Sequence, residues 1–162
     1  MKIPLRYIPK TLSNKDSIKQ KKNIQKSRKL YKKGKYYSRP MVKSFKSKPS
    51  PHIQKARKIY QIENVEPTKE LAKKTQCKMS TLEKIVNKGR GAYFSSGSRP
   101  NQSAESWGLA RLASSITGGN ASIIDFHILN DGCKPNSKAL KLAKATCKKQ
   151  KKCKNYTLKI NH

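Results

Sequence analysis

Apolar and polar residues follow a helical period through much of the chain, most clearly between residues 68 and 89. The apolar positions fit the inner faces of two short helices that meet at a three-residue corner. These positions are Leu71, Ala72, Cys77, Leu82, Ile85 and Val86. The first helix is expected from about Thr68 to Thr75, and the second from the N-cap residue Ser80 to Gly89. This arrangement resembles the helix-turn-helix motif of DNA-binding proteins.

The corner of this helix pair carries Gln76, where helix-turn-helix proteins usually have glycine. A left-handed backbone is needed at that point, so glutamine has a steric cost there. Short motifs also give false positives. The alternative interpretation is therefore a pair of helices that pack at an angle and bind no nucleic acid.

Capping residues and apolar spacing predict five further helices. The first is expected from Ser13 to Lys33, and the second over residues 51–60, after Ser50. The third is expected over Ala104–Ile116, after Ser103, the fourth over Ser122–Asn130, and the fifth after Ser137. Trp107 is expected at the centre of the core because its large ring has much apolar area to bury. The chain is therefore predicted to be all-α, as a small helical domain that contains the helix-turn-helix-like pair, with basic N- and C-terminal extensions.

The charge of +31 is distributed unevenly along the 162 residues. Residues 1–60 hold 20 basic and 1 acidic residue, residues 61–133 hold 9 and 7, and residues 134–162 hold 10 and none. This pattern predicts a basic N-terminal arm with one helix (1–49), a helical core domain (50–133) and a basic C-terminal helix or tail (134–162). So large an excess of one charge indicates a polyanionic partner or disordered extensions.

The lysines of the N-terminal helix surround it on all sides, which suggests that it lies along phosphates. Its apolar residues are too sparse for a full core face, so a partner is expected to order it. The alternative is a helix that is merely solvated. The residues expected to contact nucleic acid here are Lys32, Lys33 and Lys35. On the second helix of the central pair, Thr81, Lys84, Asn87 and Lys88 are expected to point outward into a major groove.

Aromatic and basic residues alternate in the segment 34–49, which contains Tyr36, Tyr37 and Phe45. Such aromatics can stack on the bases of single-stranded nucleic acid. They can equally hold the segment against the globular part of the protein. We favour the second interpretation because no regular stacking module is visible.

A glycine- and serine-rich segment, RGAYFSSGSRPNQSAESW, follows Gly89. Small residues let backbone N–H groups approach an anion closely, and arginines add bidentate bonds to phosphate. An outward-facing site is therefore predicted from Arg90, Ser98, Arg99, Asn101 and Gln102. The structural alternative is an ordered loop whose Tyr93 and Phe94 fill the core, and both interpretations can hold together.

The cysteines lack the C-x-x-C spacing of zinc sites, so no metal is expected. Cys77 and Cys133 are expected as small buried apolar residues, and a disulfide between Cys147 and Cys153 stays an option that the sequence does not require. No segment is apolar enough for a membrane span or a signal peptide, which favours a soluble intracellular protein without a membrane partner.

The sequence suggests neither catalysis nor a cofactor. Asp125 and His127 lie on different helical faces and form no convincing acid–base pair, so no catalytic residue is assigned. A faint likeness of the Gly-Ala-Tyr-Phe-Ser-Ser segment to ADP-ribosyltransferases is set aside because that fold is built on strands.

The block KGRGAYFSSGSRPNQSAESWGLARLASSITGGNASIIDFHILNDGC resembles an uncharacterised domain family encoded by giant DNA viruses and some tailed phages. The runs YIPKTLS and KSRKLYKKGKYYSRP also look like the giant-virus members. The resemblance covers nearly the whole chain. It implies a viral source but supplies no activity.

Two functions compete on this evidence. The first is a basic viral protein that binds or condenses genomic DNA, with duplex DNA as the favoured ligand and RNA as a variant. The second is a minor capsid or core-lining protein whose basic arms contact coat subunits or genome. Either function would place the protein in the virion or the viral factory, with the host nucleus as a further location, and not outside the cell.

Overall fold

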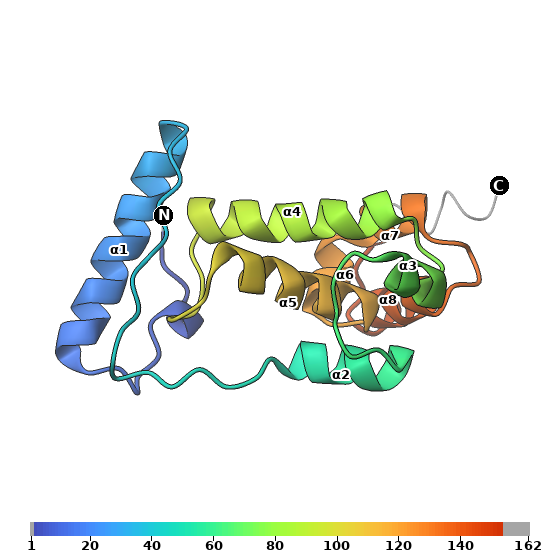
Figure 1. Cartoon of the computed structure of the whole chain (residues 1–162), viewed down its shortest axis with the longest axis horizontal. Coiled ribbons are helices and arrows are strands. Elements are labelled where there is room, and N and C mark those ends of the chain that lie inside the picture. The colour runs from blue at the N-terminus through green and yellow to red at the C-terminus, as the bar shows by residue number, and fades with distance from the viewer. Residues whose placement is uncertain (1, 154–162) are drawn as a thin grey trace. The chain divides into compact units, whose positions relative to one another are not determined.

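The computed structural model describes residues 2–153, which form helices and no strand (Figure 1). The elements are a 3-10 helix η1 (Leu5–Tyr7) and the α-helices α1 (Asn14–Lys32), α2 (Pro51–Tyr60), α3 (Lys69–Thr75), α4 (Met79–Ser95), α5 (Ala104–Ile116), α6 (Asn120–Ile124), α7 (Phe126–Gly132) and α8 (Lys138–Lys149). Cys77 and Cys133 make an isolated antiparallel bridge. The all-α prediction is confirmed.

The described chain divides into two compact units. Unit 1 contains the residues up to Lys48 together with Lys88–Gly108, and unit 2 contains Pro49–Asn87 and the residues from Leu109 onward. Helices α4 and α5 each contribute residues to both units. This division differs from the predicted arm, core and tail, because residues 88–108 belong with the N-terminal segment and α8 packs against α6 and α7.

Side-chain caps fix several helix starts where the sequence predicts them. Ser13, Thr68 and Ser137 each accept a hydrogen bond from the backbone N–H three residues later, at 3.2–3.3 Å. Ser103 and Ser106 cap each other, since each hydroxyl accepts from the other residue's backbone N–H. These bonds satisfy N–H groups that have no partner within the helix.

Helix α4 does not end at Gly89, as the sequence suggested, but continues to Ser95. Its buried positions recur at helical spacing through Leu82, Ile85, Gly89 and Tyr93, so the apolar face extends past the glycine. Glycine permits a left-handed cap but does not impose one. The segment Gly91–Ser95, which faintly resembled a strand of ADP-ribosyltransferases, is therefore helical.

The helix predicted over Ser122–Asn130 is broken at Asp125, which separates α6 from α7. The buried Asp125 carboxylate accepts two bonds from Arg111, at 2.8 and 2.9 Å, and one from Ser115, at 2.9 Å. A bidentate arginine compensates for removing the carboxylate from water. The pattern of apolar residues carries no sign of this polar anchor.

The largest apolar core lies in unit 2, where α2–α8 contribute to it. Its fully buried members include Leu71, Leu82, Ile85, Leu112, Ile116, Leu129 and Leu140. Trp107 is not at its centre, contrary to expectation. The indole is only half-buried and belongs to unit 1, where it makes an edge contact with Tyr7 at 5.8 Å between ring centroids.

Two disulfides join the four cysteines of the chain, Cys77 to Cys133 and Cys147 to Cys153. Cys77 and Cys133 are buried as expected, but they are not the separate thiols that the sequence suggested. The bridge is set up by the backbone, because Lys78 N–H donates to Gly132 C=O and Lys134 N–H donates to Gln76 C=O on either side of it. Residues far apart in sequence meet here, so spacing alone could not reveal the pair.

Candidate nucleic-acid interface

Helix α1 presents most of its lysines to solvent. Its buried residues, Gln20, Ile24 and Ser27, fall on one stripe at i, i+4 and i+7. Eight lysines in or directly after the helix are exposed: Lys15, Lys19, Lys21, Lys22, Lys26, Lys29, Lys32 and Lys33. A narrow and mostly polar stripe therefore holds a helix whose remaining surface is strongly cationic.

Residues 34–48, which we call the returning segment, turn after α1 and run back along it (Figure 1). Tyr37 donates to Asn23 at 3.3 Å, Lys19 donates to the Met41 carbonyl at 3.3 Å, and Ser44 N–H donates to Asp16 at 2.9 Å. The bonds from Ser44 hold the pKa of the Asp16 carboxyl below its usual value. The sequence interpretation of this segment as anchored to the globular part holds for Tyr37.

Backbone carbonyls at the end of α4 and in the loop after it accept hydrogen bonds from α1. Ser27 Oγ donates to Phe94 C=O at 2.9 Å, and Arg28 Nε donates to Ser96 C=O at 2.8 Å. Gln20 Nε2 donates to Ser98 C=O at 3.3 Å and also to Tyr7 C=O at 3.2 Å. The last carbonyls of a helix lack partners within it, so these side chains take the place of water.

A buried arginine from the returning segment completes this contact. Arg39 Nη1 donates to Tyr93 C=O at 2.6 Å and to Ser27 Oγ at 3.0 Å, while Nη2 donates to Ser98 Oγ at 2.8 Å. The guanidinium carbon lies 3.7 Å from the centroid of the Tyr93 ring. These acceptors are neutral, and burial lowers the pKa of Arg39 below its ordinary value.

The side chain of Asn101 binds the backbone of the same returning segment. Its side-chain oxygen accepts from Val42 N–H at 2.7 Å, and its amide nitrogen donates to Val42 C=O at 3.1 Å and Phe45 C=O at 2.8 Å. Asn101 has a left-handed backbone, with φ of +61°, which asparagine tolerates better than most residues. The amide pairs with the segment much as a neighbouring strand would.

The predicted outward-facing anion site is therefore not formed as expected. Ser98 is 1% exposed and its hydroxyl is bonded to Arg39 and to the Arg99 carbonyl, so its expected outward position is wrong. Asn101 is directed at residues 42–45, and Gln102 accepts a bond from Ser106. Small residues let the loop approach other parts of the protein closely rather than an external anion.

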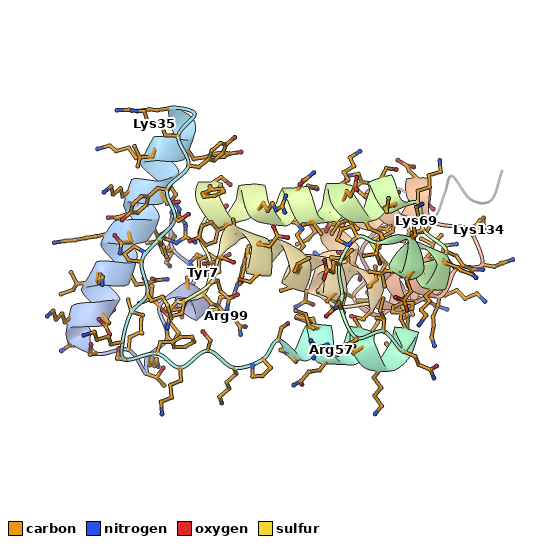
Figure 2. All side chains as sticks on the ribbon, in the orientation of Figure 1. Tyr7, Lys35, Arg57, Lys69, Arg99 and Lys134 are labelled. Atoms are coloured by element: carbon orange, nitrogen blue, oxygen red, sulfur yellow. A yellow bond between two sulfur atoms is a disulfide. The ribbon has the colours of Figure 1, made fainter. Side chains whose placement is uncertain are left out.

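The two arginines of that prediction lie at the surface. Arg99 is exposed and belongs to unit 1, and it is labelled in Figure 2. Arg90 is also exposed and forms an ion pair with Glu105. Their binding role stays a prediction, as does that of Lys32, Lys33 and Lys35, which are exposed at the C-terminal end of α1. Lys35 is labelled in Figure 2 at that end.

The corner between α3 and α4 has the predicted left-handed backbone, with φ of +56° at Gln76. Lys84 and Asn87 are exposed on the part of α4 in unit 2, and Lys88 is exposed on the part in unit 1. Thr81 is 6% exposed, and a Cβ added at Gly132 would overlap its side chain. The expected outward position of Thr81 is therefore wrong, and the helix-turn-helix pairing stays a prediction.

A cavity of about 320 Å³ lies beside this corner in unit 2. Its lining includes the cations Lys78 and Lys84 but also the carboxylate of Asp131. The mixed charge makes it a weaker phosphate site than the surface of α1, because a carboxylate repels phosphate.

Comparison with protein-family models matches residues 4–136 to a family of unknown function, DUF5824. The chain belongs to this family. The match covers α1, the returning segment and the glycine- and serine-rich loop, so all the contacts described for unit 1 fall within the DUF5824 region. Comparisons with curated proteins and with solved structures found no match.

Residues 2–153 show neither a metal-binding cluster nor a helix that could span a membrane. They contain no group of three or more His, Cys, Asp or Glu side chains arranged to hold a metal ion. In the same range, every helix is too short or too polar to cross a membrane.

Sequence reasoning did not single out two informative side chains of unit 1, Arg39 and Tyr36, from their neighbours. Arg39 stands between Ser38 and Pro40 in a basic run, and nothing in the sequence separates it from the exposed cations around it. Tyr36 differs from its neighbour Tyr37 only in the structure, where Tyr36 is 74% exposed. Each has one partner more than 50 positions away, Tyr93 for Arg39 and Phe94 for Tyr36, which a local pattern does not report.

Proposed function

We propose that this DUF5824 protein binds nucleic acid through the lysine-rich surface of α1, with duplex DNA as the first ligand to test. The observation that supports the proposal is that α1 is held by polar contacts on one narrow stripe while eight lysines on or next to it are exposed. A fixed helix presents these cations without the ordering cost of a disordered arm.

The charge of unit 1 is scarcely neutralised from within. Unit 1 holds 20 basic and 2 acidic residues, a net charge of +18. Both acidic side chains already have partners within unit 1. Asp16, on α1 itself, is bonded to Ser44 and interacts with Lys19, and Glu105 is paired with Arg90. A polyanion would therefore replace repulsion between like charges by attraction.

The length of α1 suits a nucleic-acid backbone. Nineteen residues at ~1.5 Å per residue give a helix of roughly 28 Å. Duplex DNA carries one phosphate charge per ~1.7 Å of its axis, so several lysines can be neutralised at once. Counterion release would then supply most of the affinity and make it strongly dependent on salt.

Unit 2 carries its own candidate residues for contacts with nucleic acid. Lys84 and Asn87 on α4 remain candidates for a groove, and the exposed lysines of α8 would add phosphate contacts from unit 2. Binding or condensing a viral genome in the virion or viral factory is the finer form of the proposal. It depends on the resemblance of the sequence to viral proteins.

The test is duplex binding by fluorescence anisotropy from 50 to 200 mM salt, with two quadruple variants of equal charge. One replaces Lys15, Lys21, Lys22 and Lys29 of α1 by glutamine, and the control replaces Lys55, Lys58, Lys69 and Lys73 of unit 2. Lysine and glutamine have similar helix propensities, so the helices should persist. The α1 variant should lower the slope of log affinity against log salt by about 0.9 for each phosphate that the protein no longer neutralises.

Two results would contradict the proposal. Affinity that does not change with salt would exclude binding through phosphates and favour the alternative of a minor capsid or core-lining protein. Equal losses in the two variants would show that net charge, and not the surface of α1, determines binding.

A further inference from the structure

Three aromatic side chains of unit 1 gather at the C-terminal end of α1. Tyr36 lies against Phe94, with ring centroids 5.1 Å apart, and against Tyr31, with centroids 6.2 Å apart. Tyr36 is 74% exposed and Tyr31 is 37% exposed. We call Tyr31, Tyr36 and Phe94 the aromatic platform. Packing within unit 1 does not explain why so much ring surface is exposed and yet held in place by ring contacts.

The end of α1 builds this platform through its backbone. Gly34 has φ of +74°, its N–H donates to Tyr31 C=O at 2.9 Å, and Lys35 N–H donates to Leu30 C=O at 2.9 Å. This pair of bonds is the Schellman cap, which ends a helix with a left-handed glycine. The chain therefore reverses directly after α1 and brings Tyr36 back beside Tyr31.

Adjacent tyrosines are used in opposite ways here. Tyr37 donates to Asn23, and the Lys26 ammonium covers its ring at 4.5 Å from the centroid. Its ring is occupied by contacts within unit 1. Tyr36 has only aromatic neighbours among its ring contacts and keeps most of its surface in water. A purely anchoring role explains Tyr37 and fails for Tyr36.

The surroundings of the platform indicate the chemistry of its ligand. Lys32, Lys33 and Lys35 are exposed between Tyr31 and Tyr36 in the sequence, and Lys35 is labelled at this end of α1 in Figure 2. An apolar protein partner would have to remove these ammonium groups from water at a high cost. A ligand with flat rings and regularly spaced phosphates would use both the ring surfaces and the charges.

We infer that the aromatic platform stacks unpaired bases, so that the protein binds single-stranded nucleic acid in addition to the duplex. This inference rests on the proposed nucleic-acid function and names a second class of ligand for unit 1. Lysines beside the platform bind the phosphates of the same strand. DNA and RNA share unpaired bases on a phosphodiester backbone, so the platform itself does not choose between them.

The test compares three probes of equal length and phosphate number: a 15-mer of deoxythymidine, a 15-mer of uridine, and a 15-mer that carries abasic sites throughout. The full chain should bind the first two more tightly than the third. Tyr36→Ala should weaken binding of the base-containing probes by roughly 5- to 100-fold and leave the abasic probe unchanged, since stacking requires a base. Tyr36→Phe should retain the preference because the ring remains.

The control is Leu5→Ala, which removes another exposed apolar side chain of unit 1. It should bind all three probes as the unchanged protein does. Equal affinity of the unchanged protein for base-containing and abasic probes would overturn the platform, even if duplex binding stays salt-dependent. Failure to bind both the duplex and every 15-mer would overturn the proposed function itself.

Discussion

Each of the two units of this protein is stabilised internally by a different kind of interaction. Unit 2 has an apolar core with contributions from seven helices, and the Cys77–Cys133 disulfide joins α3–α4 to the end of α7. Unit 1 has few buried apolar residues, and hydrogen bonds from Gln20, Ser27 and Arg39 to backbone carbonyls connect its parts. A cation-rich segment can thus be ordered without many apolar residues or acidic partners.

The comparison also shows how the glycine- and serine-rich loop works. Loops of this composition often bind anions through their N–H groups. In unit 1 the backbone carbonyls, and not the N–H groups, make the contacts. Donors from α1 and from Arg39 bind the carbonyls of Tyr93, Phe94, Ser96 and Ser98. Cationic and polar donors suit carbonyls, so the basic N-terminal segment and the loop are complementary.

Loss of the Cys77–Cys133 disulfide should have the largest effect and should fall on unit 2. The bridge closes a sequence separation of 56 residues, for which chain entropy gives a stabilisation of about 4 kcal/mol. Cys77→Ala with Cys133→Ala should lower the free energy of unfolding of unit 2 by that order. Amide hydrogen exchange of α7 and α8 measures the loss.

A matched pair of substitutions distinguishes the effect of loop length on stability from the effect of removing two sulfur atoms. Cys147→Ala with Cys153→Ala opens a separation of only 6 residues, so about 2 kcal/mol is expected. An equal loss in the two variants would contradict the entropic account. Unchanged exchange in the first variant, with free thiols detected in the unchanged protein, would contradict the bridge itself.

Arg39→Met should have the next largest effect and should fall on unit 1. The change leaves Tyr93 C=O without the guanidinium donor, and an unsatisfied buried group costs about 1–3 kcal/mol. The Ser27 and Ser98 hydroxyls each lose one bond, worth about 1–2 kcal/mol, and keep their bonds to backbone carbonyls. We expect a loss of roughly 3 kcal/mol, as partial relaxation offsets the sum. Fluorescence of Trp107, the single tryptophan of the chain, reports unfolding of unit 1.

Arg99→Met is the control for Arg39, because it removes the same charge from an exposed position. It should change the stability of unit 1 by less than about 0.5 kcal/mol. Equal effects of the two substitutions would mean that Arg39 acts through net charge and not through its bonds to the loop.

Local signals in the sequence were enough for much of the fold. Serine and threonine caps placed the starts of α1, α3, α5 and α8, and helical spacing identified Leu82, Ile85 and Leu140 as core residues. A cap and the residues that it serves lie within one turn, so the evidence for them is contained in a few neighbouring positions.

The errors concern partners that are distant in sequence. Thr81 was placed outward because its own helix gives no sign of Gly132, and Ser98 was placed outward because nothing near it indicates Arg39. The same is true of Cys77 and Cys133, which are paired across 56 positions. Helical periodicity predicts that an apolar face is buried, but it does not predict which polar residues a distant element will cover.

Gly97→Ala should destabilise unit 1 by about 1–3 kcal/mol, less than Arg39→Met. Gly97 has φ of +131°, and an added Cβ would lie 3.2 Å from atoms of both Ile24 and Tyr7. Gly34→Ala is the matched control, since Gly34 also has a positive φ but no neighbour within 4 Å of an added Cβ. The difference between the two variants in Trp107-detected unfolding measures the packing of the loop on α1, and no difference would exclude close packing.

Asp16→Asn should have the smallest effect, and that effect should depend on pH. Bonds from Ser44 lower the pKa of Asp16 below its ordinary value of 3.8 in the folded protein. A lowered carboxyl pKa stabilises the fold above the unfolded value, and this contribution is lost as the pH falls through the folded pKa. The melting temperature of the unchanged protein should therefore exceed that of Asp16→Asn at pH 6, and the two should converge as the pH falls below 3.8 and through the folded pKa.

Ser44→Ala provides the complementary measurement for Asp16, because it removes the hydroxyl bond and leaves the carboxyl. The NMR-detected pKa of Asp16 should then rise toward 3.8. If the pKa is the same with and without the Ser44 hydroxyl, that bond does not lower it. The other bonds that hold the returning segment would remain: those from Arg39 to α1 and to the loop, and those from Asn101 in the loop to residues 42–45. The contrast between the units would then depend on these bonds.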